Sequence, residues 1–88
     1  MSAQFIDEFV LNKVNEDESF GVDLRDSDPF VFRFDGVNCI FANSIEEKLS
    51  EVEILNKVKD IFSNASEEQI KSDFKDFKSY LQEQNLIK

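Results

Sequence analysis

The sequence predicts one α+β domain over residues 1–88, in which a three-stranded antiparallel sheet is followed by three helices (β-β-β-α-α-α). Before residue 35 the apolar residues alternate with polar ones, as in strands that bury one face. After residue 35 they recur every three or four residues, as in amphipathic helices. A chain of 88 residues supports a single compact core, and its ten Phe residues provide apolar surface to fill that core.

The clearest strand is the segment Phe-Val-Phe-Arg-Phe at residues 30–34, which an Asp-Gly step ends. Side chains on a strand point to opposite faces in turn, so the phenylalanines share one face and the valine and arginine share the other. Such a stripe is typical of a core-facing strand, and it could also line a ligand pocket. We expect Phe30, Phe32 and Phe34 to face the core, while the edge of the strand stays open to a partner.

Two further strands are expected before it. The first, over about residues 8–14, competes with a helical turn in the same segment and is preferred because Val10 and Val14 favour sheet. An alternation at residues 20–25 predicts the second, and an Asp-Ser-Asp-Pro turn then connects it to the strand at 30–34 as a hairpin. The buried face of this second strand is expected to carry Phe20, Val22 and Leu24.

The first two helices begin at recognisable capping residues. Asp35 is a good N-cap for a short helix at 36–43. Ser50 and Glu53 form a capping box, which predicts that the second helix begins after Ser50. A Ser-Asn-Ala step ends this helix. Its inward stripe is expected to contain Val52, Leu55, Val58, Ile61 and Phe62.

The last helix begins at a second capping box, formed by Ser66 and Gln69. Asn85 can adopt the left-handed conformation that ends a helix, after which Leu86 and Ile87 turn back toward the core. The order of the elements resembles a winged-helix arrangement with its wing strands first. The buried stripe of the last helix is expected to contain Ile70, Phe74, Phe77 and Leu81.

The composition argues against several functional classes. The net charge is −9, which repels phosphate groups, so nucleic-acid binding and binding to anionic membranes are not expected. The chain also has no His and only one Cys. Without His, the commonest general base is missing and no zinc site of the usual Cys/His type can form. The N-terminus lacks the features of a signal peptide, and no apolar run approaches the length of a membrane span. We therefore expect a cytoplasmic protein without enzymatic activity, metal or cofactor.

The acidic clusters and the cysteine have plain explanations. The acidic residues at 7–8, 16–18 and 26–28 lack the spacing of a calcium-binding loop, so we interpret them as solvated turns and caps. Cys39 lies beside Ile40 in the short apolar helix expected at 36–43 and has no His to activate it, so we expect it to behave as a small buried hydrophobic residue.

The flanks of the last helix differ in charge. Asp73, Tyr80 and Gln84 fall on one flank, and three lysines fall on the other. The lysines could be solvated and paired with aspartates on the same helix, or they could form a basic rim that receives an acidic partner segment. A groove between this helix and the strand at 30–34 would offer backbone pairing on one wall and side chains on the other. The lysines are Lys71, Lys75 and Lys78.

Three segments of the chain resemble a known family. Residues 32–41, Phe-Arg-Phe-Asp-Gly-Val-Asn-Cys-Ile-Phe, resemble its step from the third strand to the first helix. Residues 49–55, Leu-Ser-Glu-Val-Glu-Ile-Leu, resemble its Thr-Val-x-Glu-Ile opening of the second helix, and residues 70–87 resemble its last helix with the closing Leu-x-x-x-Gly-Leu-Ile. This is the PqqD-like family, also called the RiPP recognition element. Asp35 replaces the usual Asn and Asn85 the usual Gly, and Glu-Glu-Lys replaces a Gly before the second helix.

The resemblance implies a non-catalytic adaptor in natural-product biosynthesis. Such domains bind the leader of a ribosomally made precursor peptide as an antiparallel strand added to the third strand, beside the third helix. They deliver the peptide to a modifying enzyme, often a radical S-adenosylmethionine (radical SAM) enzyme. The alternative is an acidic winged-helix regulator or a nucleic-acid-mimicking inhibitor. Transferred to this sequence, the peptide-binding residues are Phe30, Val31, Phe32, Arg33 and Phe34 on the strand, and Lys71, Phe74, Lys75 and Lys78 on the helix.

Overall fold

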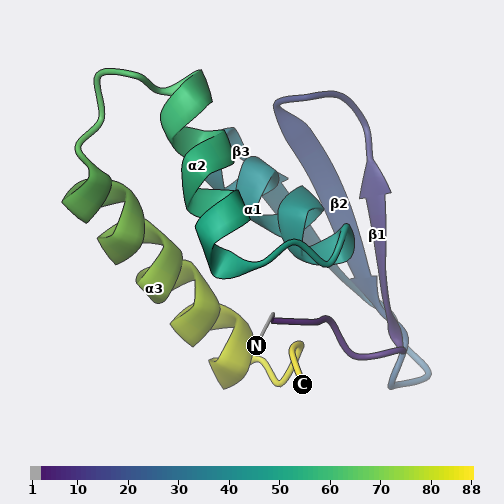
Figure 1. The fold of residues 1–88 in the computed structure, drawn as a ribbon. Helices are drawn as coiled ribbons and strands as arrows, with labels where there is room; N and C mark the ends of the chain where they lie inside the picture. The colour runs from purple at the N-terminus through teal and green to yellow at the C-terminus, as the bar shows by residue number, and fades with distance from the viewer. Residues whose placement is uncertain (1–2) are drawn as a thin grey trace.

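A computed structural model describes residues 3–88 and confirms the expected order of elements. The three strands form one antiparallel sheet in the order β1-β2-β3, so β1 and β3 are its edges. The three helices form a layer over one face of this sheet (Figure 1). The elements are β1 (Phe9–Lys13), β2 (Glu18–Asp23), β3 (Phe30–Asp35), α1 (Gly36–Glu46), α2 (Glu51–Ile61) and α3 (Glu67–Glu83).

The core lies between the sheet and the helices. Phe32 and Phe34 of β3 are buried in it, as the alternation predicted, whereas Phe30 at the start of β3 is 63% exposed. The other face of the sheet carries no helix and shows a row of three valines, Val10, Val22 and Val31, which the strand register places side by side. Within residues 3–88 no helix combines the length and the apolar character that crossing a membrane requires.

The predicted buried face of β2 is wrong. Ser19 and Gly21 face the core, while Leu24 lies beyond the strand and is half exposed. Two contacts with other elements explain this orientation. The Ser19 hydroxyl donates a hydrogen bond to Asn43 Oδ1 of α1 at 2.8 Å, so it is satisfied inside the core. The Phe9 ring lies over Gly21, where an added Cβ would come within 2.0 Å of Phe9 Cζ. Phe20 and Val22 therefore lie on the outer face.

Helix α1 begins where it was predicted and runs three residues further, to Glu46. Asp35 occupies the N-cap position without a capping hydrogen bond, because its carboxylate pairs with Arg33 instead (Asp35 Oδ2 to Arg33 Nη1, 2.9 Å). Cys39 is buried, as expected, but its neighbours are polar: Asn43 Nδ2 donates to Cys39 Sγ at 3.4 Å. This small buried polar cluster joins α1 to β2.

The capping box of α2 is confirmed, whereas most of its predicted inward stripe is wrong. Glu53 N donates to Ser50 Oγ, and Ser50 N donates to Glu53 Oε1, which holds the pKa of the Glu53 carboxyl below its usual value. The stripe that is buried consists of Ile54 and Val58, and the predicted Leu55 is partly buried against the core beside it. Val52 precedes Ile54 by two residues, which corresponds to about 200° around the helix. Its side chain therefore points away from the buried stripe and is 67% exposed. Ile61 and Phe62 lie at the exposed C-terminal end of the helix.

Helix α3 begins after Ser66, as predicted, but only half of its capping box forms: Ser66 Oγ accepts from Gln69 N, whereas the Gln69 side chain donates to Asp73 and does not bond back to Ser66. All four residues of its predicted stripe are buried. Asn85 adopts φ 58°, and Leu86 returns to the core and is fully buried. Lys48, in the loop between α1 and α2, adopts φ 63°, a conformation that glycine favours.

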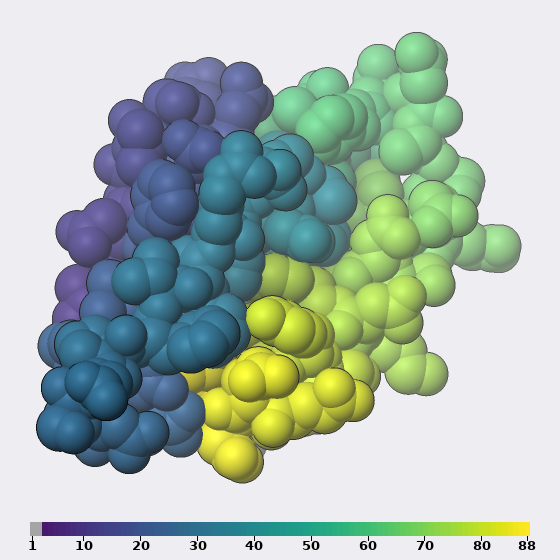
Figure 2. Space-filling view, turned by 180° about the vertical axis from the view of Figure 1, so that it is seen from behind, coloured from purple at the N-terminus to yellow at the C-terminus, as the bar shows by residue number. Residues whose placement is uncertain are grey.

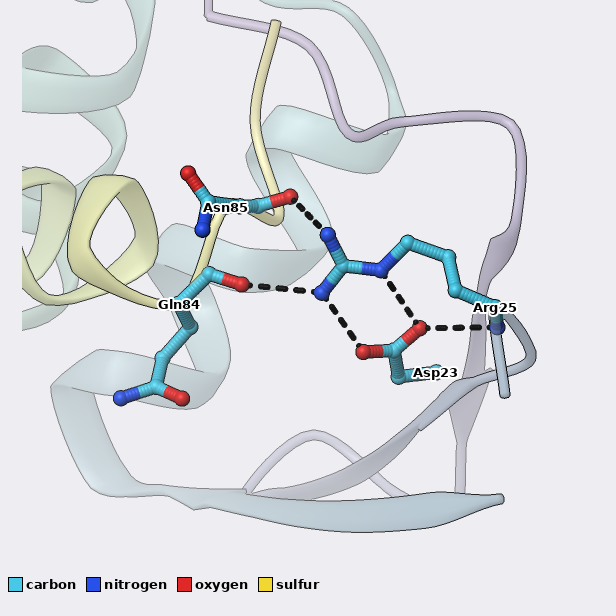
Figure 3. Close-up of polar contacts among 4 residues, drawn as sticks. All are labelled: Asp23, Arg25, Gln84 and Asn85. Carbon is cyan, nitrogen blue, oxygen red and sulfur yellow. Dashed lines mark hydrogen bonds and ion pairs between the residues drawn. The ribbon is translucent and has the colours of Figure 1, made fainter. Parts of the chain in front are cut away.

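An arginine holds the C-terminal end of α3 against the sheet (Figure 3). Arg25, just after β2, donates from Nη1 to the Asn85 carbonyl and from Nη2 to the Gln84 carbonyl, both at 2.9 Å. Asp23 orients the guanidinium, with an Nη2 to Oδ2 distance of 2.7 Å. The hydrogen bonds from Arg25 lower the pKa of the Asp23 carboxyl, and the bond to Asp23 raises the pKa of Arg25. This contact satisfies terminal helix carbonyls and fixes where α3 lies relative to β3.

Candidate functional site

A groove of ≈ 580 Å³ runs between β3 and α3. We call it the β3–α3 groove. Figure 2, seen from behind, shows the blue residues of β3 beside the yellow-green residues of α3. All five predicted strand residues line it, together with the start of α1 and one flank of α3. Its lining residues are Phe30, Val31, Phe32, Arg33, Phe34, Val37, Asn38, Asp73, Asp76, Phe77 and Tyr80.

Within residues 3–88 no strand pairs with the outer edge of β3, which forms the strand wall of this groove. Residues of an antiparallel pair alternate between those that bond to the neighbouring strand and those that point away from it. Gly36 N donates to the Asp17 carbonyl at 3.2 Å, in register with the β2–β3 ladder. Counting back in steps of two, the even-numbered residues of β3 bond to β2. The N–H and C=O groups of Val31, Arg33 and Asp35 therefore face the free edge.

The groove has an aromatic floor at one end. The Phe30 ring lies 4.8 Å from the Phe32 ring, and the Phe32 ring lies 6.4 Å from the Tyr80 ring in an edge-on arrangement. Further along, the Phe34 ring lies 5.6 Å from the Phe77 ring. Phe32, Phe34 and Phe77 are buried, whereas Phe30 is largely open to solvent and Tyr80 is partly exposed. The floor therefore continues from the core into an exposed apolar surface, a kind of surface that binds partners.

The helix wall of the groove differs from the expected one. The structure places Lys71, Lys75 and Lys78 on the flank of α3 that faces away from β3, and none of them lines the groove. Lys78 instead pairs with Glu51 of α2 at 3.4 Å, and its Nζ lies 4.9 Å from the centre of the Phe74 ring. Lys71 pairs with Glu67, one turn earlier, at 3.5 Å. Phe74, which was also expected to bind the peptide, is buried in the core and does not line the groove.

The charge of the groove is negative where a basic rim was expected. Asp73 and Asp76 project from α3 into the groove, and the ion pairs formed within residues 3–88 include neither of them. Asp73 accepts one hydrogen bond, from Gln69 Nε2 at 2.8 Å. Arg33 does not neutralise them, because its guanidinium is held by Glu18 (2.7 Å) and Asp35 (2.9 Å).

These contacts also act on the pKa of Arg33. The hydrogen bond to Glu18 raises it most, and the charges of Glu18 and Asp35 raise it further. The guanidinium therefore stays charged, and its Nε and Nη1 groups donate to Glu18 and Asp35. The groove thus offers unpaired backbone groups, aromatic surface and two carboxylates, which can bind an extended peptide.

Within residues 3–88 no group of three or more His, Cys, Asp and Glu side chains is arranged to hold a metal ion. The Cys39 thiol is buried beside Ser19 and Asn43, away from the β3–α3 groove.

Sequence reasoning missed the α3 residues that line the groove and the contribution of α1. Asp73, Asp76, Phe77 and Tyr80 are spaced three and four residues apart, so they share one helical face. The signal was present in the sequence, since Asp73 and Tyr80 were recognised as the second flank of this helix. Nothing in the helix itself showed which flank faces β3. Val37 and Asn38 enter the groove because α1 begins directly after β3.

Comparison of the chain with protein-family models, with curated proteins and with solved structures found no match.

Proposed function

We propose that this protein is a non-catalytic peptide-binding adaptor. It binds the leader of a ribosomally made precursor peptide as an antiparallel strand added to β3, and it delivers the peptide to a modifying enzyme, often a radical SAM enzyme in pathways of this kind. The proposal rests on the resemblance of three segments to the PqqD-like family and on the geometry of the β3–α3 groove. It places the protein in the biosynthesis of modified peptides.

The observation that carries the proposal is the free edge of β3 inside a groove. An unpaired strand edge is a template for strand addition, and proteins that do not use such an edge cover it or place charges along it. Here the edge adjoins a helix wall at a distance that leaves ≈ 580 Å³ open. A peptide in this position would form main-chain hydrogen bonds with Val31 and Arg33 and would place alternate side chains against α3.

A display selection tests strand addition directly. Random peptides of about 12 residues, long enough to span β3, are selected on the immobilised protein and then titrated by fluorescence anisotropy. Val31→Pro removes one donor from the free edge, and edge strands tolerate proline where the N–H faces away from the sheet. Lys13→Pro is the matched control, because Lys13 ends the opposite edge strand. Circular dichroism and thermal melting establish that both variants fold.

We expect the selected peptides to lose at least about tenfold in affinity for Val31→Pro, as expected when a central contact is removed, and to retain their affinity for Lys13→Pro. Equal binding to the wild type and both variants would contradict strand addition to β3.

Affinity purification from the source cells tests delivery. The wild-type protein should recover a short precursor peptide together with its modifying enzyme, and folded Val31→Pro should recover less of the peptide. Recovery of nucleic acid or of a basic nucleic-acid enzyme in place of these partners would favour the acidic-inhibitor alternative, which draws on the net charge of −9.

A further inference from the structure

The β3–α3 groove has two chemically different ends. Along β3 from Phe32 to Phe34, the aromatic partners on α3 change from Tyr80 to Phe77, so the strand and the helix run in opposite directions. Continuing in this direction, the wall of α3 reaches Asp76 and Asp73 beside the start of α1. One end of the groove is therefore aromatic and the other carries two carboxylates.

The carboxylates at the second end are available to a ligand. Lys71 and Lys78, which lie on the same helix, pair with other carboxylates: Lys71 with Glu67 of α3 and Lys78 with Glu51 of α2. The Arg33 guanidinium forms its ion pairs with Glu18 and Asp35, not with Asp73 or Asp76. A cationic side chain that entered the groove would thus meet Asp73 and Asp76 without displacing an existing ion pair.

The spacing of the two ends matches an extended peptide. Asp76 precedes Tyr80 by four residues, about 6 Å along the helix axis, and Asp73 precedes it by about 10.5 Å. Residues two apart on a strand share a face and lie about 6.6 Å apart. On one bound peptide, a side chain that contacts Phe30 and Tyr80 is therefore two residues away from a side chain that reaches Asp76. It is four residues away from a side chain that reaches Asp73.

The direction of the peptide fixes the order of these two side chains. An antiparallel partner of β3 runs from the aspartate end of the groove toward the Tyr80 end, because β3 itself runs from Phe30 toward Asp35. Building on the proposed function, we propose that the groove selects a peptide with Lys or Arg two or four residues before a large apolar residue. The sequence alone had suggested an acidic partner for a lysine rim, whereas the groove lining favours a basic one.

The test examines the composition of the selected peptides and two charge variants. The probe is again a random library of peptides of about 12 residues, displayed against the full chain. The selected peptides are titrated against wild type, Asp73→Asn/Asp76→Asn and the control Glu67→Gln/Glu68→Gln. The control removes two charges from the lysine flank of the same helix. Each titration is repeated at low and high salt, and Val31→Pro is included to locate binding at the β3 edge.

The expected result is enrichment of Lys or Arg at the stated spacing before an apolar residue. The expected loss of affinity is about three- to tenfold for Asp73→Asn/Asp76→Asn, with little change for the control. This difference should shrink at high salt, which screens exposed charges.

Two other results would overturn the inference in distinguishable ways. The selected peptides could lose affinity for Val31→Pro and yet show no preference for Lys or Arg, or carry the apolar residue before the basic one. Either result would refute the stated specificity and leave strand addition to β3 supported. Peptides whose binding is unaffected by Val31→Pro would refute both the specificity and the proposed function.

Discussion

The pair formed by β3 and α3 has a closed side and an open side. On the closed side, β3 bonds to β2 through its even-numbered residues, and Lys78 of α3 meets Glu51 of α2. On the open side, the backbone of Val31 and Arg33 faces the groove, and Asp73 and Asp76 form no ion pair within residues 3–88. The closed side uses its polar groups for the fold, whereas the open side leaves its polar groups available for a ligand.

This comparison predicts a separation of effects. Substitutions on the closed side should lower the free energy of unfolding and leave the affinity of the folded protein for peptide unchanged. Substitutions on the open side should weaken the affinity for peptide and change the free energy of unfolding little. The following experiments are ordered from the largest expected effect to the smallest.

The largest contrast is between two aromatic residues on α3. Phe77 is buried between Phe34 and Phe41, so Phe77→Ala should lower the free energy of unfolding by about 3–5 kcal/mol. Tyr80 is 42% exposed, so Tyr80→Ala should cost less than about 1.5 kcal/mol while it weakens peptide binding. Urea unfolding and anisotropy titration measure the two quantities. Equal destabilisation by both substitutions would mean that Tyr80 belongs to the core.

Gly21 tests the closed side from β2, where it lies directly opposite Phe32 in the sheet. An added Cβ would come within 2.0 Å of Phe9 Cζ, so Gly21→Ala should lower the free energy of unfolding by about 1–3 kcal/mol. The double variant Gly21→Ala/Phe9→Leu should be more stable than the sum of the two single effects predicts, because the smaller side chain makes room. Strict additivity in urea unfolding would show that the two residues do not compete for space.

The charges of α3 test the comparison within a single helix. Lys78→Ala removes the ion pair with Glu51 and the contact with the Phe74 ring, and should lower the free energy of unfolding by about 1 kcal/mol. Asp76→Asn should change it by less than about 0.5 kcal/mol, because no ion pair is lost. A larger destabilisation by Asp76→Asn than by Lys78→Ala would reverse the assignment of the two flanks.

The smallest effect concerns stability at acid pH and the contact of Asp23 and Arg25 with the C-terminal end of α3, which we call the Arg25 clamp. The pKa of Asp23 is lowered in the folded state by Arg25, so its contribution to stability is present above the unfolded pKa and is lost as the pH falls through the folded pKa. Wild type should therefore lose stability below about pH 4. Asp23→Asn should start lower at neutral pH and change less over that range. Identical slopes of the urea midpoint against pH would show that the Arg25 clamp contributes nothing in solution.

Strongly periodic segments could be predicted from the sequence because local pattern and tertiary role agree there. The strand at 30–34 and the buried stripe of α3 are examples. The buried face of β2 could not be predicted, because Ser19 and Gly21 point inward only through contacts with α1 and β1. Residues that distant in the chain leave no local signal.

The site was predicted on one wall and not on the other. The free edge of β3 follows from strand order and composition. The choice between the two flanks of α3 depends on how the helix rotates and docks against the sheet, which the Arg25 contact at its C-terminal end and the packing of Phe77 determine. Both flanks border the same apolar stripe, so the helix sequence alone does not distinguish them.

Amide hydrogen exchange, measured by NMR with and without a selected peptide, tests the central claim most directly. The N–H groups of Val31 and Arg33 should gain protection when the peptide binds, because they face the free edge. The N–H groups of Phe32 and Phe34 should change little, because they already bond to β2. This alternation along β3 is the result that strand addition predicts. Protection that is uniform along β3, or that arises on β1 instead, would contradict it.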